Sequence, residues 1–204
     1  MTTRPPPVRA VSAGHATGQS PRRLRPPTIR RTLRVGAGLL AGAIASPASA
    51  QVQAHDHTLP LDLAMEAARE AVQACAARGW PVSAAVVDAG GVVRVQLKGD
   101  RSTIHTRDSS FRKAYTQITL GPVFGFDRLS EGVEKLRANP NAPALATLPD
   151  ILLLGGAVTV RANDEPIAAI GVGGAPGGDK DEACAAAGLA KIADRLPSSA
   201  RAPR

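Results

Sequence analysis

Few side chains in this chain are of a type that does chemistry, and they do not form a recognisable catalytic group. Ser109 and Ser110 lack the surroundings of a nucleophile elbow, and neither cysteine has a basic neighbour at a spacing that would activate a thiolate. No catalytic triad can therefore be assembled, and whether the chain is an enzyme stays open. Beyond residue 50, the histidine, cysteine, methionine and tyrosine side chains that could donate to a metal ion are His55, His57, His105, Tyr115, Met65, Cys75 and Cys184.

His105 is the best placed of these donors, and the alternative that it is a solvated histidine at the start of a helix stays open. It stands in the first turn of a predicted helix, just after the charged loop 98–101. Lys98, Arg101 and Arg112 could hold a carboxylate there, or serve as ordinary surface charges. Tyr115 shares an apolar helix face with its neighbours, so we expect it in the core.

His55 and His57 flank Asp56 near the start of the predicted domain. Three closely spaced donors without a distant fourth make a poor structural metal site. We therefore expect a loose tail at this point rather than a metal-binding site.

A glycine-rich bend joins an apolar strand to an alanine-rich helix over residues 166–189. Pro176 stands where a dinucleotide fingerprint needs glycine, and Asp179 stands where a phosphate loop needs lysine. Asp179, with Glu182 three residues later, predicts a helix cap. We expect a tight strand-to-helix turn rather than a direct ligand cradle.

The remaining pattern predicts one α+β domain. Thr58 is the expected cap of the first helix, and Gly121 with Pro122 is the expected end of the second. The order of elements implies a single antiparallel sheet with helices packed against it. Helices are expected at 58–75, 103–120, 128–137 and 180–196, strands at 82–87, 93–98, 151–154, 157–161 and 167–172, and a loop at 139–143.

The first 50 residues have the layout of an export signal. Eight of the chain's 25 basic residues precede Gln51 and all 17 acidic residues follow it, so the net charge of +8 belongs to this leader. An apolar stretch at 35–44, too short to span a membrane, leads to an A-x-A site at 48–50. We expect cleavage before Gln51, no stable membrane anchor afterwards, and a periplasmic or secreted product.

Arg30 and Arg31 resemble the pair of a twin-arginine signal, although the general export route stays open. The expected organisation is an export signal at 1–50, a loose linker at 51–58, a domain at 59–196 and a loose tail at 197–204. Aromatic residues are only 2% of the chain. This is too few to provide the aromatic side chains on which proteins that bind single-stranded nucleic acid stack the bases. We expect no nucleic-acid partner.

Cys75 and Cys184 are the only cysteines. Each lies among alanines in a predicted helix, where a cysteine behaves as a small buried apolar residue. We expect both thiols to be free, although an oxidising compartment would permit a bond if the Cα atoms came within about 7 Å.

Four segments, in order, resemble the GlcG/HbpS-like family, also called the haem-degrading or DUF336 family. They are PVSAAVVDAGG at 81–91, KAYT at 113–116, LLGG at 153–156, and IGVGG at 170–174 followed by Asp179 and Cys184. The resemblance spans residues 59–196 and implies a profilin-like fold. Residues 157–159 depart from it, because Ala-Val-Thr stands where Gly-x-Pro is usual.

Members of this family include exported haem-binding proteins, an accessory product of glycolate utilisation, and a domain fused to corrinoid adenosyltransferases. The resemblance implies haem as cofactor, peroxide-driven breakdown of it, and a homo-oligomer. Haem would lie between the second helix and the glycine-rich bend, with His105 as the iron ligand. The resemblance supplies only the ligand, and the residues themselves supply the candidate site: His105, Lys98, Arg101, Ile104, Gly173 and Gly174.

Two alternatives remain open. In one, Lys98, Arg101 and the bend bind a small hydroxy or keto acid, in an enzyme or an accessory protein. In the other, the domain is a structural assembly module.

Overall fold

The computed structural model describes residues 57–197, so the predicted export signal, most of the predicted linker and most of the predicted tail lie outside the described residues. The elements are α1 (Leu61–Ala76), β1 (Ser83–Asp88), β2 (Val93–Lys98), α2 (His105–Phe124), α3 (Leu129–Arg137), α4 (Ala142–Leu145), β3 (Ala157–Ala162), β4 (Glu165–Gly173), α5 (Gly178–Ile192) and a short 3-10 turn (Ala193–Arg195).

The four strands form one antiparallel sheet in the order β2-β1-β4-β3. The central strands β1 and β4 are almost wholly buried, which explains their continuous runs of valine, alanine and isoleucine. The edge strand β2 instead alternates between apolar and polar residues. The α+β fold class with a single antiparallel sheet is confirmed.

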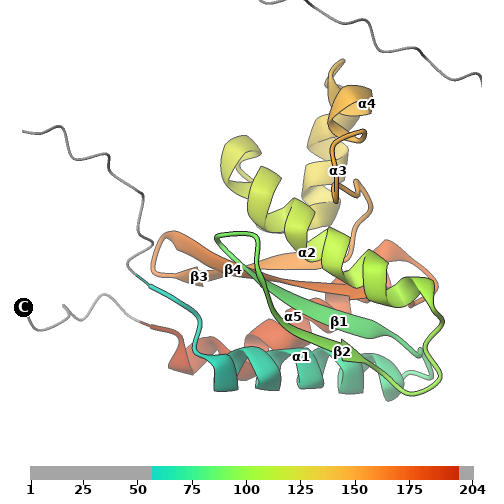
Figure 1. Cartoon of the computed structure of the whole chain (residues 1–204), viewed down its shortest axis with the longest axis vertical. Coiled ribbons are helices and arrows are strands. Elements are labelled where there is room, and N and C mark those ends of the chain that lie inside the picture. Colours follow the sequence, from blue (N-terminus) through green and yellow to red (C-terminus); the bar gives the residue numbers. More distant parts are fainter. Residues whose placement is uncertain (1–56, 198–204) are drawn as a thin grey trace, which may run out of the picture. The chain divides into compact units, whose positions relative to one another are not determined.

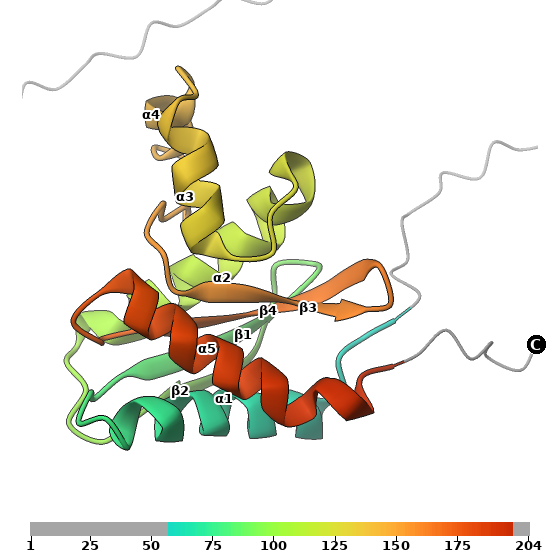
Figure 2. The ribbon, with the colours of Figure 1, turned by 180° about the vertical axis from the view of Figure 1, so that it is seen from behind.

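Helices cover both faces of the sheet. Figures 1 and 2 show α1 and α5 side by side on one face and α2 across the other. Small residues let α1 and α5 approach closely, since a Cβ on Gly188 would lie 2.4 Å from the carbonyl oxygen of Ala67. On the opposite face, Ala114 and Ile118 of α2 pack against Val87 and Ala169. The central strands β1 and β4 are therefore covered from both sides.

Two helix ends differ from the predictions. The helix α2 continues through Pro122 to Phe124 and ends at Gly125, whose φ of 67° is left-handed. Pro122 lies in the last turn, so the helix ends two residues after the backbone donor that this proline removes. The helix α1 begins after Pro60, and Thr58 makes no capping hydrogen bond.

The segment 151–154 is not a strand, contrary to prediction. It is held from α2 instead: Arg112 donates to the carbonyl oxygen of Ile151 at 2.7 Å, and the N–H of Leu152 donates to Oγ1 of Thr116 at 2.7 Å. The predicted loop at 139–143 also contains the start of the short helix α4. Apolar runs this short do not reveal whether their partner is a strand or a side chain.

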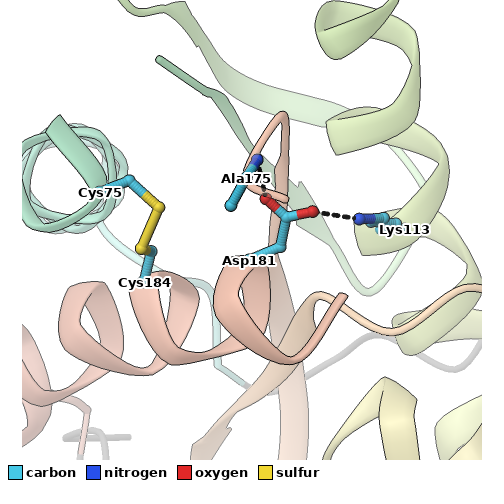
Figure 3. Close-up of a disulfide and its surroundings, with 5 residues drawn as sticks. All are labelled: Cys75, Lys113, Ala175, Asp181 and Cys184. Carbon is cyan, nitrogen blue, oxygen red and sulfur yellow. Dashed lines mark hydrogen bonds and ion pairs between the residues drawn. A yellow bond between two sulfur atoms is a disulfide. The ribbon is translucent and has the colours of Figure 1, made fainter. Parts of the chain in front are cut away.

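The prediction of free cysteines was wrong. Cys75 and Cys184 form a disulfide between α1 and α5, with S–S 2.07 Å and Cα–Cα 5.6 Å (Figure 3). Both residues are fully buried, as expected, but the close packing of the two helices brings the sulfur atoms together. Within residues 57–197, no helix has both the length and the apolar character needed to cross a membrane.

The disulfide closes a long segment, because the two cysteines are 109 residues apart. Replacing both with alanine should lower the free energy of unfolding by about 2–5 kcal/mol, mainly by releasing the constraint on the unfolded chain. Denaturant unfolding of the wild type and the double variant measures this, and equal midpoints would contradict it. Thiol titration of unreduced, denatured wild type should find no free thiol.

Candidate functional site

Most of the predicted site residues come together at one end of the sheet. The loop between β2 and α2 and the glycine-rich bend between β4 and α5 lie at the same end in both views (Figures 1 and 2). Lys98 ends β2, Arg101 lies in the loop with a left-handed φ of 62°, and Ile104 and His105 begin α2. We call Lys98, Arg101, Ile104 and His105 the helix-start patch.

The helix-start patch is open to solvent. Ile104 is 90% exposed, an unusual state for a large aliphatic side chain, and the other three residues are exposed as well. Nδ1 of His105 lies 3.1 Å from Oγ1 of Thr103, and Nζ of Lys98 donates to the carbonyl oxygen of Ser102. Arg101 forms no ion pair with any described residue.

The two predicted glycines lie behind this patch, in contact with the start of α2. A Cβ on Gly173 would lie 2.2 Å from Oγ of Ser109, and one on Gly174 would lie 3.0 Å from Cγ2 of Thr106. Gly174 also has a φ of 129°, which favours glycine. The bend thus packs directly on α2, and a planar ligand has room only on the solvent side of this contact.

A buried ion pair fixes the bend to α2. Nζ of Lys113 donates to Oδ2 of Asp181 at 2.6 Å, and these side chains are only 3% and 4% exposed (Figure 3). Oδ1 of Asp181 accepts the N–H of Ala175 at 2.9 Å. A Cβ on Gly156 would lie 2.8 Å from both Lys113 Nζ and Asp181 Cβ. Residue 156 must therefore be glycine for the ion pair to fit beside it.

Burial raises the pKa of Asp181, because desolvation penalises the carboxylate more than Lys113 and the backbone N–H groups stabilise it. The pair nevertheless satisfies the charge of each partner inside the protein. The sequence interpretation used Lys113 only as part of a family segment and assigned it no role. No sequence signal links it to Asp181, which lies 68 residues away.

Glu182 is also buried, and its role differs from the prediction. Its carboxylate accepts the N–H and the Oγ of Ser130 at 2.9 and 2.7 Å and lies 3.3 Å from Nη1 of Arg128. It therefore stabilises the start of α3, where a negative charge is favourable. The predicted capping box with Asp179 does not form, since α5 begins at Gly178 without a side-chain cap.

The sequence Ala-Val-Thr at 157–159, which stands where Gly-x-Pro was expected from the resemblance, also has a structural role. Oγ1 of Thr159 accepts Nε2 of Gln117 at 2.7 Å, and the same amide donates to the carbonyl oxygen of Phe126 at 3.0 Å. Among the described residues, Oε1 of the buried Gln117 has no partner. Thr159 thus supplies an acceptor that a proline there would lack.

A further hollow lies elsewhere, between α1 and the edge strand β2. It is a groove of about 550 Å³ with an apolar floor, open to solvent. Its lining includes Leu61, Met65, Arg69, Arg94, Val95 and Leu97. It contains no member of the helix-start patch.

No other donor cluster is present in residues 57–197, since no three His, Cys, Asp or Glu side chains gather there in a way that could hold a metal ion. Nδ1 of His57 lies 3.0 Å from Oε2 of Glu165. His55 lies outside the described residues. Tyr115 is partly buried beside Phe111, with ring centroids 5.7 Å apart, as expected for a core residue.

Removing one partner of the Lys113–Asp181 pair should destabilise the fold strongly. Lys113→Met leaves a buried carboxylate without its cation and should lower the free energy of unfolding by about 3–5 kcal/mol near neutral pH. The loss should shrink as the pH falls through the raised pKa of Asp181, because a protonated Asp181 carries no charge. Denaturant unfolding across pH measures both effects.

The matched control is Arg137→Ala, which breaks the exposed Arg137–Glu134 pair and should leave stability nearly unchanged. Adding Asp181→Leu to Lys113→Met should recover part of the loss, because no buried charge remains. A Lys113→Met variant as stable as the wild type would contradict the importance assigned to this pair.

Comparison with known proteins identifies the family. The description "Haem degrading protein HbpS-like" matches residues 59–190. The chain is 39% identical to a crystal structure of HbpS, covering 67% of this chain and 92% of that one, with TM-score 0.61. A double mutant of Streptomyces reticuli HbpS is also 39% identical, covering 74% and 96%, with TM-score 0.61.

A more distant structure shares the fold alone. PduOC in complex with haem is 18% identical, covering 66% of this chain and 95% of that one, with TM-score 0.59. None of the curated proteins compared with the chain matches it. The family description covers most of the described residues, and the HbpS structure agrees with it in both sequence and fold. This chain therefore belongs to the HbpS-like (DUF336) family.

Proposed function

We propose that this protein binds haem, or a closely related tetrapyrrole, on the helix-start patch. The family description names haem, and the structural relatives include a haem complex. We choose this site because the side chain of Ile104 is 90% exposed. It belongs to the same patch as the imidazole of His105 and the cationic side chains of Lys98 and Arg101. The apolar side chain offers a surface on which a ring could rest, and the neighbouring donors could bind its iron and its carboxylates.

The donors of the patch fit the chemistry of haem. The contact of Nδ1 of His105 with Thr103 leaves Nε2 available to an iron ion, and such a contact at one ring nitrogen is the usual way to orient a ligating histidine. His105 is thus the proposed axial ligand. Iron bound there would supply peroxide-driven breakdown of the ring, which is the finer activity we propose.

The charges of the patch fit the polar edge of the ring. Arg101 is exposed and free of ion pairs among residues 57–197, and Lys98 has N–H donors beyond the one used by Ser102. Both can hold a propionate while the ring rests on Ile104. Burying part of the ring then contributes apolar transfer energy, and the charged edge stays in water.

Gly173 and Gly174 would support the patch rather than touch the ligand. Their lack of side chains lets the bend lie against Ser109 and Thr106, which sets the position of the first turn of α2. His105 begins that turn. We include them in the site for this reason.

Haem titration tests the proposal. Purified protein titrated with hemin should show a saturable Soret shift near one equivalent per chain. His105→Ala should change the spectrum and raise the dissociation constant about tenfold or more, because it removes the iron ligand. Ile104→Ser should weaken binding without changing the ligation signature.

The matched control is His57→Ala, since His57 contacts Glu165 near the start of α1, outside the patch. It should leave both spectrum and affinity unchanged. Without a saturable shift in the wild type, haem binding fails as the function, and a small hydroxy or keto acid held by Lys98 and Arg101 becomes the leading ligand. If the His105→Ala variant shows the same Soret shift as the wild type, another residue binds the iron.

We also propose that the protein acts outside the cytoplasm after cleavage before Gln51. Mass spectrometry of protein from its native host should find a mature chain that begins at or near Gln51. Replacing Arg30 and Arg31 with lysine should block export through the twin-arginine route and leave the general route unaffected. Intact residues 1–50 on cytoplasmic protein would contradict export.

A further inference from the structure

We propose that a groove at the opposite edge of the sheet, between β3 and the end of α5, binds a small monocarboxylate that has an apolar tail. We call it the β3 groove. Its volume is about 370 Å³, which is within the range of small-molecule sites. It contains no member of the helix-start patch, so this inference does not depend on haem binding.

The floor of the β3 groove is apolar. Val158 comes from β3, Ala186 and Leu189 come from α5, and Leu196 follows the 3-10 turn. Val158 is fully buried, and the other three are partly buried where they pack against the main core. An alkyl chain that leaves water to lie on this floor gains apolar transfer energy.

Two charged side chains of the lining already satisfy each other. Nε and Nη2 of Arg161 lie 2.9 and 2.8 Å from Oδ1 of Asp127, and Nη1 donates to the carbonyl oxygen of Asp164. Each nitrogen of this guanidinium therefore has a partner in the protein. The charge of Asp127 is balanced by the same contact.

Arg128 differs, because part of its guanidinium is unused. Nη1 lies 3.3 Å from Oε1 of Glu182, and no other hydrogen bond links this guanidinium to a residue within 57–197. Glu182 has closer donors in the N–H and the Oγ of Ser130. The side chain of Arg128 is 50% exposed and lines the groove. Its Nε and Nη2 thus remain available to a ligand.

These features select the chemistry of the ligand. Two N–H donors in a planar fork match the two oxygens of a carboxylate. The apolar floor matches an alkyl tail on the same molecule. Because the carboxylates of Asp127 and Glu182 lie close to Arg128, a second negative charge on the ligand would be repelled. A monoanion therefore fits better than a dicarboxylate or a phosphate monoester.

Haem is the competing ligand, since it too joins an apolar surface to carboxylates. The described residues that line the β3 groove include no histidine, cysteine, methionine or tyrosine, so none of the usual protein donors to haem iron is present there. Haem also carries two propionates, whereas the groove offers one unused guanidinium. The observations therefore favour a small monocarboxylate.

Isothermal titration calorimetry of the purified chain with octanoate tests the site. Octanoate should bind saturably near one equivalent per chain. Octanol lacks the carboxylate and acetate lacks the tail, so each should bind at least about tenfold more weakly. Arg128→Gln should weaken octanoate binding by about tenfold, because it removes the charged fork, and should leave the weak binding of octanol unchanged.

Two further variants separate the groove from the rest of the surface. Ala186→Leu fills part of the floor without removing a charge and should weaken octanoate binding. Arg137→Gln is the matched control, since Arg137 is exposed and pairs with Glu134 outside the groove, and it should bind octanoate like the wild type. Circular dichroism confirms that each variant is folded.

Three results would overturn the proposal whether or not haem binds elsewhere on the protein. The first is a wild type without saturable octanoate binding. The second is octanol binding as tight as that of octanoate, or a folded Arg128→Gln variant that binds octanoate as tightly as the wild type. The third is displacement of bound octanoate by one equivalent of hemin, because haem would then occupy the groove.

Discussion

The buried ion pair between Lys113 and Asp181 is the contact on which the arrangement of this domain depends. It joins α2, on one face of the sheet, to the start of α5, which covers the other face (Figure 3). Gly156 makes this possible, since a side chain there would occupy the space of both partners. Because each charge would be costly to bury alone, the pair forces the two helices and the glycine-rich bend into one arrangement.

This arrangement connects the core to the proposed site. The disulfide lies one turn beyond Asp181 in α5 and ties that helix to α1, so three helices are joined by covalent or ionic contacts. The ion pair sets the position of α2, and the packing of Gly173 and Gly174 sets that of its first turn. Ile104 and His105 are thereby presented at the end of the sheet, on a rigid support rather than on a free loop.

The sequence predicted the fold well where patterns are local. Alternating β2, the buried runs of β1 and β4, and the glycines of the bend each carry their own signal. Prediction from the sequence failed for features that depend on contacts between residues far apart in the chain. Cys75 and Cys184 look like small buried apolar residues because nothing local shows that α1 and α5 pack together. Lys113 carried no role in the sequence, and Glu182 was predicted to cap its own helix, because their partners Asp181 and Ser130 lie far away in the sequence. The helix-start patch was predicted as a group because its members are close in sequence, whereas the groove at β2 needs the sheet order to be seen.

The central claim is that the helix-start patch holds haem through His105. A crystal structure of the protein grown with hemin, with anomalous data collected at the iron edge, tests it most directly. The account predicts an iron peak within bonding distance of Nε2 of His105, with the ring on Ile104 and its propionates toward Lys98 or Arg101. An iron peak in the groove between α1 and β2, or beside any other donor, would contradict it.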